Sequence, residues 1–121
     1  METNAAVETL SALAHEGRLA LFRVLIKAGP GGLAAGRLGE AVGMAPSTLS
    51  NNLAVLTRAG LATSVRDGRS IIYAADYGRM SDLLAFLMED CCDGSPEICA
   101  PLGDVLARMA CCPPELRSGM S

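Results

Sequence analysis

The sequence has few aromatic residues: no tryptophan, two phenylalanines and two tyrosines among 121 residues. Its core must therefore be built from Leu, Ala, Val, Ile and Met. No apolar run approaches the ~20 residues that a membrane helix needs. The first residues, METNAAVE, lack the basic and apolar segments of a secretory signal. We therefore expect one small cytoplasmic domain with no membrane partner.

The sequence also lacks the patterns typical of enzymes. It has no Cys-x-x-Cys pair, no phosphate-binding loop and no evident acid–base pair, so we do not expect an enzyme. His15 is the only histidine. A structural zinc site usually needs four Cys or His ligands at short spacings, which disfavours zinc here. At the entrance of a predicted helix, His15 is expected to be structural.

The net charge of −3 is unevenly distributed along the chain. Residues 1–43 are neutral, residues 44–79 carry +2, and residues 80–121 carry −5. The middle segment is therefore the part that could contact a polyanion, even though the chain as a whole is acidic.

Apolar spacing predicts helices over residues 7–14, 17–28, 35–42, 46–59 and 77–90. Two strands, 62–66 and 70–75, are expected on either side of the turn at Asp67-Gly68. This order predicts a mainly α fold with a small β-hairpin, the winged helix-turn-helix. The last helix has a wide apolar face that little else can cover, which favours a homodimer with the first helix at its seam. This face comprises Met80, Leu83, Leu84, Leu87 and Met88. We expect residues 1–92 to form the DNA-binding and dimerisation domain and residues 93–121 a cysteine-containing extension.

The helix over 46–59 has two contrasting faces. Leu49, Leu53 and Leu56 form an apolar stripe, and short polar residues occupy the remaining positions. Such a helix can enter the major groove of double-stranded DNA, and arginines at the hairpin tip can add phosphate or minor-groove contacts. The predicted DNA-binding residues are Ser47, Thr48, Ser50, Asn51, Asn52 and Arg58 on the helix, and Arg66 and Arg69 at the hairpin.

Several motifs resemble the ArsR/SmtB family of bacterial metal-responsive repressors over residues 7–90. Residues 13–19 (LAHEGRL) are similar to its L-A-x-x-x-R-L signature. Residues 38–44 (LGEAVGM), 47–53 (STLSNNL) and 56–61 (LTRAGL) resemble its helix-turn-helix, and residues 66–69 (RDGR) with Ile72 and Tyr73 resemble its wing. The resemblance implies a homodimer that binds a palindromic operator and releases it when an inducer binds.

The sequence departs from this family at two places. Many members have histidine at the position of Asn52 and a longer polar residue at that of Asn51. Asparagine can still bond adenine edges. Arsenic sensors of one common type carry thiolates at the start of the third helix, whereas residues 34–37 (AAGR) contain none. Any sensor site of this chain must therefore lie elsewhere.

All five cysteines lie in the last third of the chain: Cys91, Cys92, Cys99, Cys111 and Cys112. Thiolates favour soft, thiophilic centres such as trivalent arsenic and antimony. The pair Cys91-Cys92 with Cys99 resembles the site of an arsenic-responsive ArsR subgroup, in which a Cys-Cys pair and a nearby cysteine follow the last dimer helix. The resemblance implies arsenite or methylarsenite as inducer, with antimonite as a further candidate, bound within one subunit or between two.

Other interpretations of the cysteines stay open. Oxidation or persulfidation of paired thiols could regulate the same fold, giving a redox-sensing repressor. The vicinal pairs also resemble those of arsenic metallochaperones, although a carrier needs neither a recognition helix nor a wing. A single cysteine can be a small buried hydrophobe. Cys111 and Cys112 have no assigned role.

Overall fold

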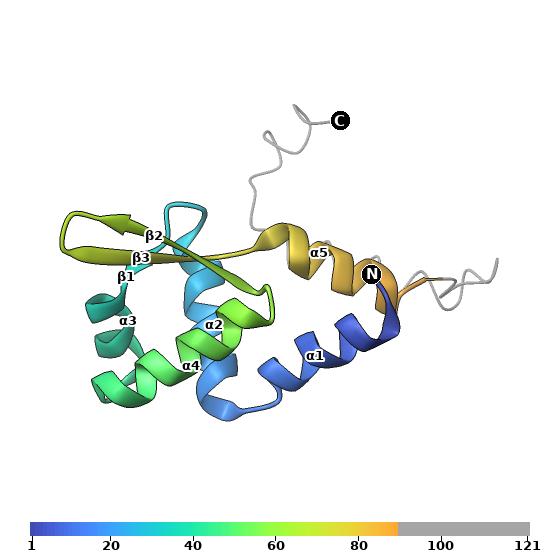
Figure 1. Cartoon of the computed structure of the whole chain (residues 1–121), viewed down its shortest axis with the longest axis horizontal. Helices are drawn as coiled ribbons and strands as arrows, with labels where there is room; N and C mark the ends of the chain where they lie inside the picture. The colour runs from blue at the N-terminus through green and yellow to red at the C-terminus, as the bar shows by residue number, and fades with distance from the viewer. Residues whose placement is uncertain (90–121) are drawn as a thin grey trace. The chain divides into compact units, whose positions relative to one another are not determined.

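The computed structural model describes residues 1–89, and the chain divides into two units, Met1–Phe86 and Leu87–Ser121. The first unit contains five helices and a three-stranded antiparallel sheet (Figure 1), which confirms the predicted winged helix-turn-helix. The elements are α1 (Thr3–Leu13), α2 (Glu16–Ala28), β1 (Leu33–Ala34), α3 (Ala35–Val42), α4 (Pro46–Arg58), β2 (Ala62–Asp67), β3 (Ser70–Ala75) and α5 (Tyr77–Leu87). The domain boundary predicted after residue 92 lies outside the described residues.

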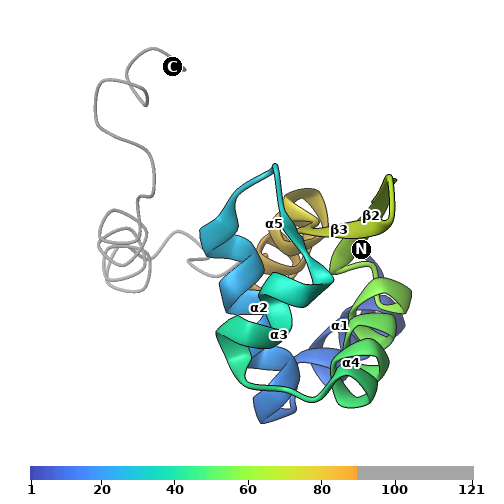
Figure 2. The same cartoon turned by 90° about the vertical axis from the view of Figure 1, so that its left-hand side faces the viewer.

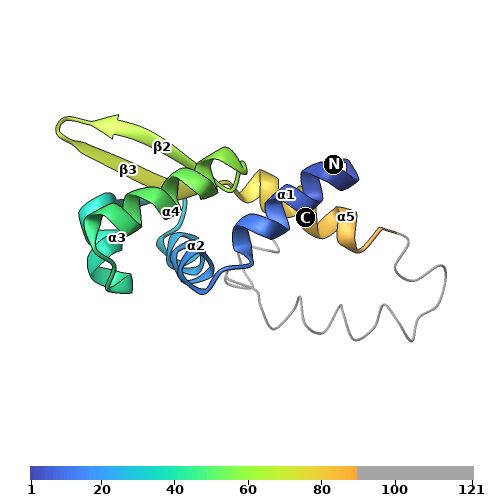
Figure 3. The same ribbon diagram turned by 60° about the horizontal axis from the view of Figure 1, so that its bottom comes forward.

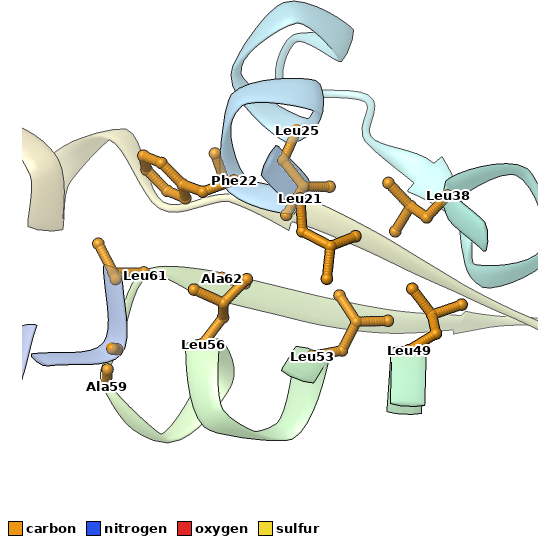
Figure 4. Close-up of a cluster of buried hydrophobic side chains, with 12 residues drawn as sticks. Leu21, Phe22, Leu25, Leu38, Leu49, Leu53, Leu56, Ala59, Leu61 and Ala62 are labelled. Carbon is orange, nitrogen blue, oxygen red and sulfur yellow. The ribbon is translucent and has the colours of Figure 1, made fainter. Parts of the chain in front are cut away.

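The core consists almost entirely of aliphatic side chains, as the scarcity of aromatic residues requires. Leucines from α2, α3 and α4 meet at its centre (Figure 4). The fully buried leucines are Leu21, Leu25, Leu38, Leu53 and Leu56 of these helices, and Leu61, which lies between α4 and β2. Removing apolar surface from water stabilises the fold by roughly 25 cal/mol per Å². The leucine stripe of α4 therefore fixes which side of that helix faces inward.

Helix α2 begins at a side-chain cap. The His15 Nδ1 accepts hydrogen bonds from the backbone N–H groups of Gly17 at 3.1 Å and Arg18 at 3.4 Å. These donors have no partner inside the helix, so the cap stabilises its first turn. The predicted structural role of His15 is confirmed. Along the same helix, Leu21, Phe22 and Leu25 are buried, whereas Ile26 is 36% exposed.

Helix α4 ends in two backbone hydrogen bonds, one enclosed by the other. Leu61 N–H donates to Leu56 O at 2.9 Å, and Gly60 N–H donates to Thr57 O at 3.0 Å. Gly60 adopts φ +81, the left-handed conformation that this ending requires. Arg79 of α5 lies across the same glycine and donates from Nε to Ala59 O at 3.2 Å. The start of α5 is thus joined to the end of α4.

The sheet has the order β1-β3-β2, and every pairing is antiparallel. Strand β1 was not predicted, because two residues are too few to show an alternating pattern. It pairs Leu33 with Tyr73 and Ala34 with Ile72. Gly32 precedes it with φ +71, and any Cβ there would collide with the carbonyl of Tyr73. Glycine therefore allows the chain to reach the sheet at this point.

Helices α1 and α5 lie at the end of the first unit farthest from the hairpin tip (Figures 1 and 3), and both carry exposed apolar side chains. Val7 and Leu10 of α1 are 55% and 40% exposed, and Leu84 of α5 is 44% exposed. Leu83 is buried and Met80 packs against the core. The predicted apolar face of α5 is therefore partly used within the subunit and partly free for a partner. Leu87 and Met88, in the second unit, are also exposed.

Candidate nucleic-acid interface

A tight turn connects α3 to α4 (Figure 2). Gly43 ends α3 in the left-handed conformation, with φ +68, and its N–H donates to Gly39 O at 2.8 Å. Pro46 then occupies the first turn of α4, where the missing N–H costs nothing. This local chemistry defines both ends of the turn and presents the first turn of α4 to solvent.

The face of α4 opposite the core is polar and exposed. Leu49, Leu53 and Leu56 point inward. Four of the predicted DNA-binding residues, Ser47, Thr48, Ser50 and Asn51, are exposed. Short hydroxyl and amide groups of this kind can donate to and accept from base edges and phosphates.

Asn52 differs from these four residues. Its side chain is 6% exposed, and its Oδ1 accepts a hydrogen bond from Arg18 Nη1 at 3.3 Å. Its Nδ2 donates to the Met44 sulfur at 3.6 Å. Asn52 therefore lies on the buried side of α4 and not with the four exposed polar residues, and its DNA contact stays a prediction. The physical reason is helical spacing: Asn52 lies three positions after Leu49 and four before Leu56, on the buried side.

The β-hairpin lies beside α4 (Figure 3) and ends in a two-residue loop. Asp67 pairs with Ser70, and Gly68 takes φ +65 in the loop between them. Arg69 is in this loop and Arg66 is near the end of β2, and both are exposed. We call the six exposed residues Ser47, Thr48, Ser50, Asn51, Arg66 and Arg69 the α4–wing surface. That they contact DNA stays a prediction.

A groove of about 540 Å³ lies between α3, the start of α4 and β3. Ser50 borders it on α4, and Ile71 and Tyr73 border it on β3. The α3 side of the groove is lined by small residues, including Gly36 and Gly39. Of the α4–wing surface, Ser50 alone lines this groove.

The arginines of the middle segment have different roles. Arg58 is exposed in the last turn of α4, where it borders a hollow with Val7 and Ser11 of α1. Its predicted DNA contact stays a prediction. Arg79 is committed to the end of α4, and Asp76 caps α5 by accepting from Arg79 N–H at 3.0 Å. The charges of Arg79 and Asp76 cancel each other. The net charge of +2 over residues 44–79 is therefore carried by three exposed arginines, Arg58, Arg66 and Arg69, less the exposed Asp67.

The predicted metalloid site, Cys91, Cys92 and Cys99, lies outside the described residues. Within residues 1–89, no three His, Cys, Asp or Glu side chains gather in a group that could hold a metal ion. Among the helices of this part of the chain, none is long and apolar enough to span a bilayer.

Comparisons with known proteins agree with this geometry. Residues 13–65 match a family model described as a helix-turn-helix domain. No curated protein matches the chain. HlyU from Vibrio cholerae shares 32% identity over 72% of this chain and 97% of its own, with a TM-score of 0.58. A structure of reduced HlyU also matches, at 25% identity and a TM-score of 0.55, over 72% of this chain and 90% of its own.

Two further structures bear on assembly and regulation. One is a homodimeric winged helix-turn-helix DNA-binding domain from Mycobacterium bovis, described as a possible ArsR-family transcriptional regulator. It shares 27% sequence identity with this chain. It covers 72% of this chain and 81% of its own, with a TM-score of 0.57. A possible transcriptional regulator for arsenical resistance is also 27% identical, with a TM-score of 0.59. That match covers 80% of this chain and 95% of the other.

Proposed function

This chain belongs to the ArsR family of winged helix-turn-helix transcriptional regulators, and on that premise we propose that it is a homodimeric repressor released from operator DNA by trivalent arsenic or antimony. The proposal places the protein in the cytoplasm, where its thiols stay reduced. The fold and the relatives are those of transcriptional regulators that bind DNA, not of enzymes.

The observation that carries the DNA-binding role is the α4–wing surface. It combines an exposed row of short polar side chains with two exposed arginines at the hairpin tip. Hydroxyl and amide groups suit base edges, whereas guanidinium groups suit phosphates or the minor groove. The hairpin lies beside α4, so one surface offers both kinds of contact to one duplex.

Exposed aliphatic side chains support the homodimer. Val7, Leu10 and Leu84 lie on two helices away from the wing, and a second copy would remove them from water. The M. bovis relative is a homodimer. A two-fold dimer would present two copies of α4 to successive major grooves, which calls for a palindromic operator.

The cysteine triad supports the choice of inducer. Cys91 and Cys92 follow α5 by only a few residues, and Cys99 lies close behind them in sequence. Three thiolates suit a trivalent arsenic or antimony centre. One relative is described as a possible transcriptional regulator for arsenical resistance, which agrees with an arsenic ligand. Because these cysteines follow α5 in the sequence, ligand binding to them would act on the chain directly after the helix that carries the exposed Leu84 and that Arg79 joins to α4.

A DNA-release assay tests the proposal. A labelled duplex selected by the wild-type protein from a random pool is bound, and arsenite, methylarsenite, antimonite, zinc and peroxide are titrated separately. Arsenite or antimonite should lower the affinity by roughly 5- to 150-fold or more, the range of a typical allosteric coupling. Cys91→Ser, Cys92→Ser and Cys99→Ser should abolish the response. Cys111→Ser with Cys112→Ser is the matched control and should retain it. Unchanged affinity in arsenite, methylarsenite and antimonite alike would overturn the inducer assignment.

A thiol redox repressor is the second candidate, favoured by the likeness to HlyU, one of whose structures is of the reduced protein. Two thiols would lose two electrons and two protons to form a disulfide while peroxide is reduced to water. Release by peroxide or polysulfide, with no response to arsenite, would establish this alternative. Failure to bind any DNA would instead favour an arsenic metallochaperone.

A further inference from the structure

Two side-chain-to-side-chain hydrogen bonds occur in the described part of the chain, and both involve Asn52 of α4. Arg18 Nη1 donates to Asn52 Oδ1 at 3.3 Å, and Asn52 Nδ2 donates to the Met44 sulfur at 3.6 Å. These bonds connect α4 to α2 and to the turn that precedes α4. Both of these side-chain bonds therefore converge on the helix that carries the α4–wing surface.

Arg18 extends the connection to α1. Its Nε donates to Ala12 O near the end of α1 at 2.6 Å. One guanidinium group thus holds the end of α1, through Ala12, and the middle of α4, through Asn52. Because α1 carries the exposed Val7 and Leu10, the same arginine lies between the predicted dimer seam and the recognition helix.

The rest of the α4 contact is aliphatic. Leu49, Leu53 and Leu56 pack by shape and size, which tolerates small rotations and shifts of a helix at little cost. A hydrogen bond depends on both distance and angle, so it penalises those same movements. A single buried polar residue can fix the register of an otherwise apolar helix contact.

We propose that Arg18 and Asn52 are positioning residues that set the rotation and axial position of α4, and that they thereby determine how well the protein distinguishes its operator from other DNA. The inference rests on the proposed DNA binding. Neither residue needs to touch DNA, because the effect passes through the placement of Ser47 and Asn51 on the opposite face of α4.

The key variant is Asn52→Leu, which replaces the amide with a side chain of similar size beside Leu53. Arg18 also borders an open hollow, so its guanidinium can be hydrated when its partner is lost. We expect the melting temperature to be retained. We expect the ratio of affinities for the selected duplex and a scrambled duplex to fall about tenfold, comparable to losing one good base contact. Overall attraction to scrambled DNA should not change, because phosphate contacts provide it.

Two further variants separate positioning from stability. Asn52→Asp keeps the acceptor for Arg18 and gains a charge-assisted bond, so it should retain the affinity ratio within about twofold. Arg18→Lys keeps the charge but cannot reach Ala12 O and Asn52 Oδ1 with a planar fork, so it should lower the ratio. Combined with Asn52→Leu, it should add little further loss. Thr57→Val is the matched control, because its hydroxyl bonds only to Leu53 O within α4.

The inference would be overturned if Asn52→Leu kept both its melting temperature and the ratio of affinities for the selected and scrambled duplexes. It would also be overturned if Thr57→Val lowered that ratio as much as Asn52→Leu does. If Asn52→Leu does not fold, the comparison of Asn52→Asp with Arg18→Lys decides, and equal ratios for these two would refute the positioning role. A wild-type protein that shows no preference between the two duplexes would refute the proposed function itself.

Discussion

Replacing the two wing arginines should weaken DNA binding in a strongly salt-dependent way. Arg66 and Arg69 are both exposed at the hairpin tip, and neither is needed by the core. The double variant Arg66→Gln, Arg69→Gln therefore removes charge from the α4–wing surface while keeping long polar side chains. The strand pairing from Ala62↔Ala75 to Asp67↔Ser70 depends on backbone groups and should persist.

The size of the effect follows from counterion release. Each lost phosphate contact reduces the magnitude of the negative slope of log Kobs against log[salt] by about 0.9. Two arginines in each subunit of a dimer give four contacts, so the magnitude of the slope should fall by about 3.6. When salt rises from 50 to 200 mM, both proteins should lose affinity. The fold-loss of the wild type should be about 150 times the fold-loss of the variant.

Fluorescence anisotropy with the selected duplex, repeated across salt concentrations, measures this slope. The matched control is Arg23→Gln with Lys27→Gln, which removes the same charge from exposed positions of α2. The control should change the slope by much less. An unchanged slope in the wing variant, or an equal fall in the control, would show that the wing arginines do not bind phosphates.

Three further predictions concern stability and assembly. In urea unfolding at fixed protein concentration, His15→Ala should lose about 1 kcal/mol through the α2 cap, and His15→Asn should recover most of it; equal stabilities would refute the cap. Gly60→Ala should cost about 1–2 kcal/mol, because its Cβ would lie in a left-handed backbone 2.8 Å from Arg79 Nε. Gly36→Ala, which meets nothing within 4 Å, should be neutral or stabilising. Leu84→Glu should weaken dimerisation in sedimentation experiments, whereas Leu19→Glu, on the similarly exposed Leu19, should not; equal sedimentation of the two variants would contradict the proposed seam.

Much of the fold could be predicted because its signals are local. The bounds of α3 match the predicted residues 35–42, since its apolar spacing is clear and Gly43 stops the helix. The hairpin was recognisable from its glycine turn and two alternating segments. Strand β1 escaped because its only evidence is pairing with β3, which a two-residue segment cannot reveal.

The candidate site shows where residue type misleads. Asn52 was assigned to the DNA face because it is polar, although its spacing from Leu49 and Leu56 already placed it inside. Arg79 counted toward the positive middle segment, but the fold uses it to cap α4. Arg18 stood out only as part of a motif, because its partners lie 6 and 34 residues away. The cysteine site lies outside the described residues and stays a prediction.

Selection of DNA from a randomised duplex pool tests the central claim most directly, that a dimer reads DNA through α4. The wild type should enrich a palindrome whose half-sites lie about 10–10.5 base pairs, or a multiple of this, apart. Asn51→Ala should lose the preference at one position in each half-site while retaining the others. Enrichment of no sequence, or of an asymmetric one that Asn51→Ala selects equally well, would show that the protein does not read DNA as a dimer through α4.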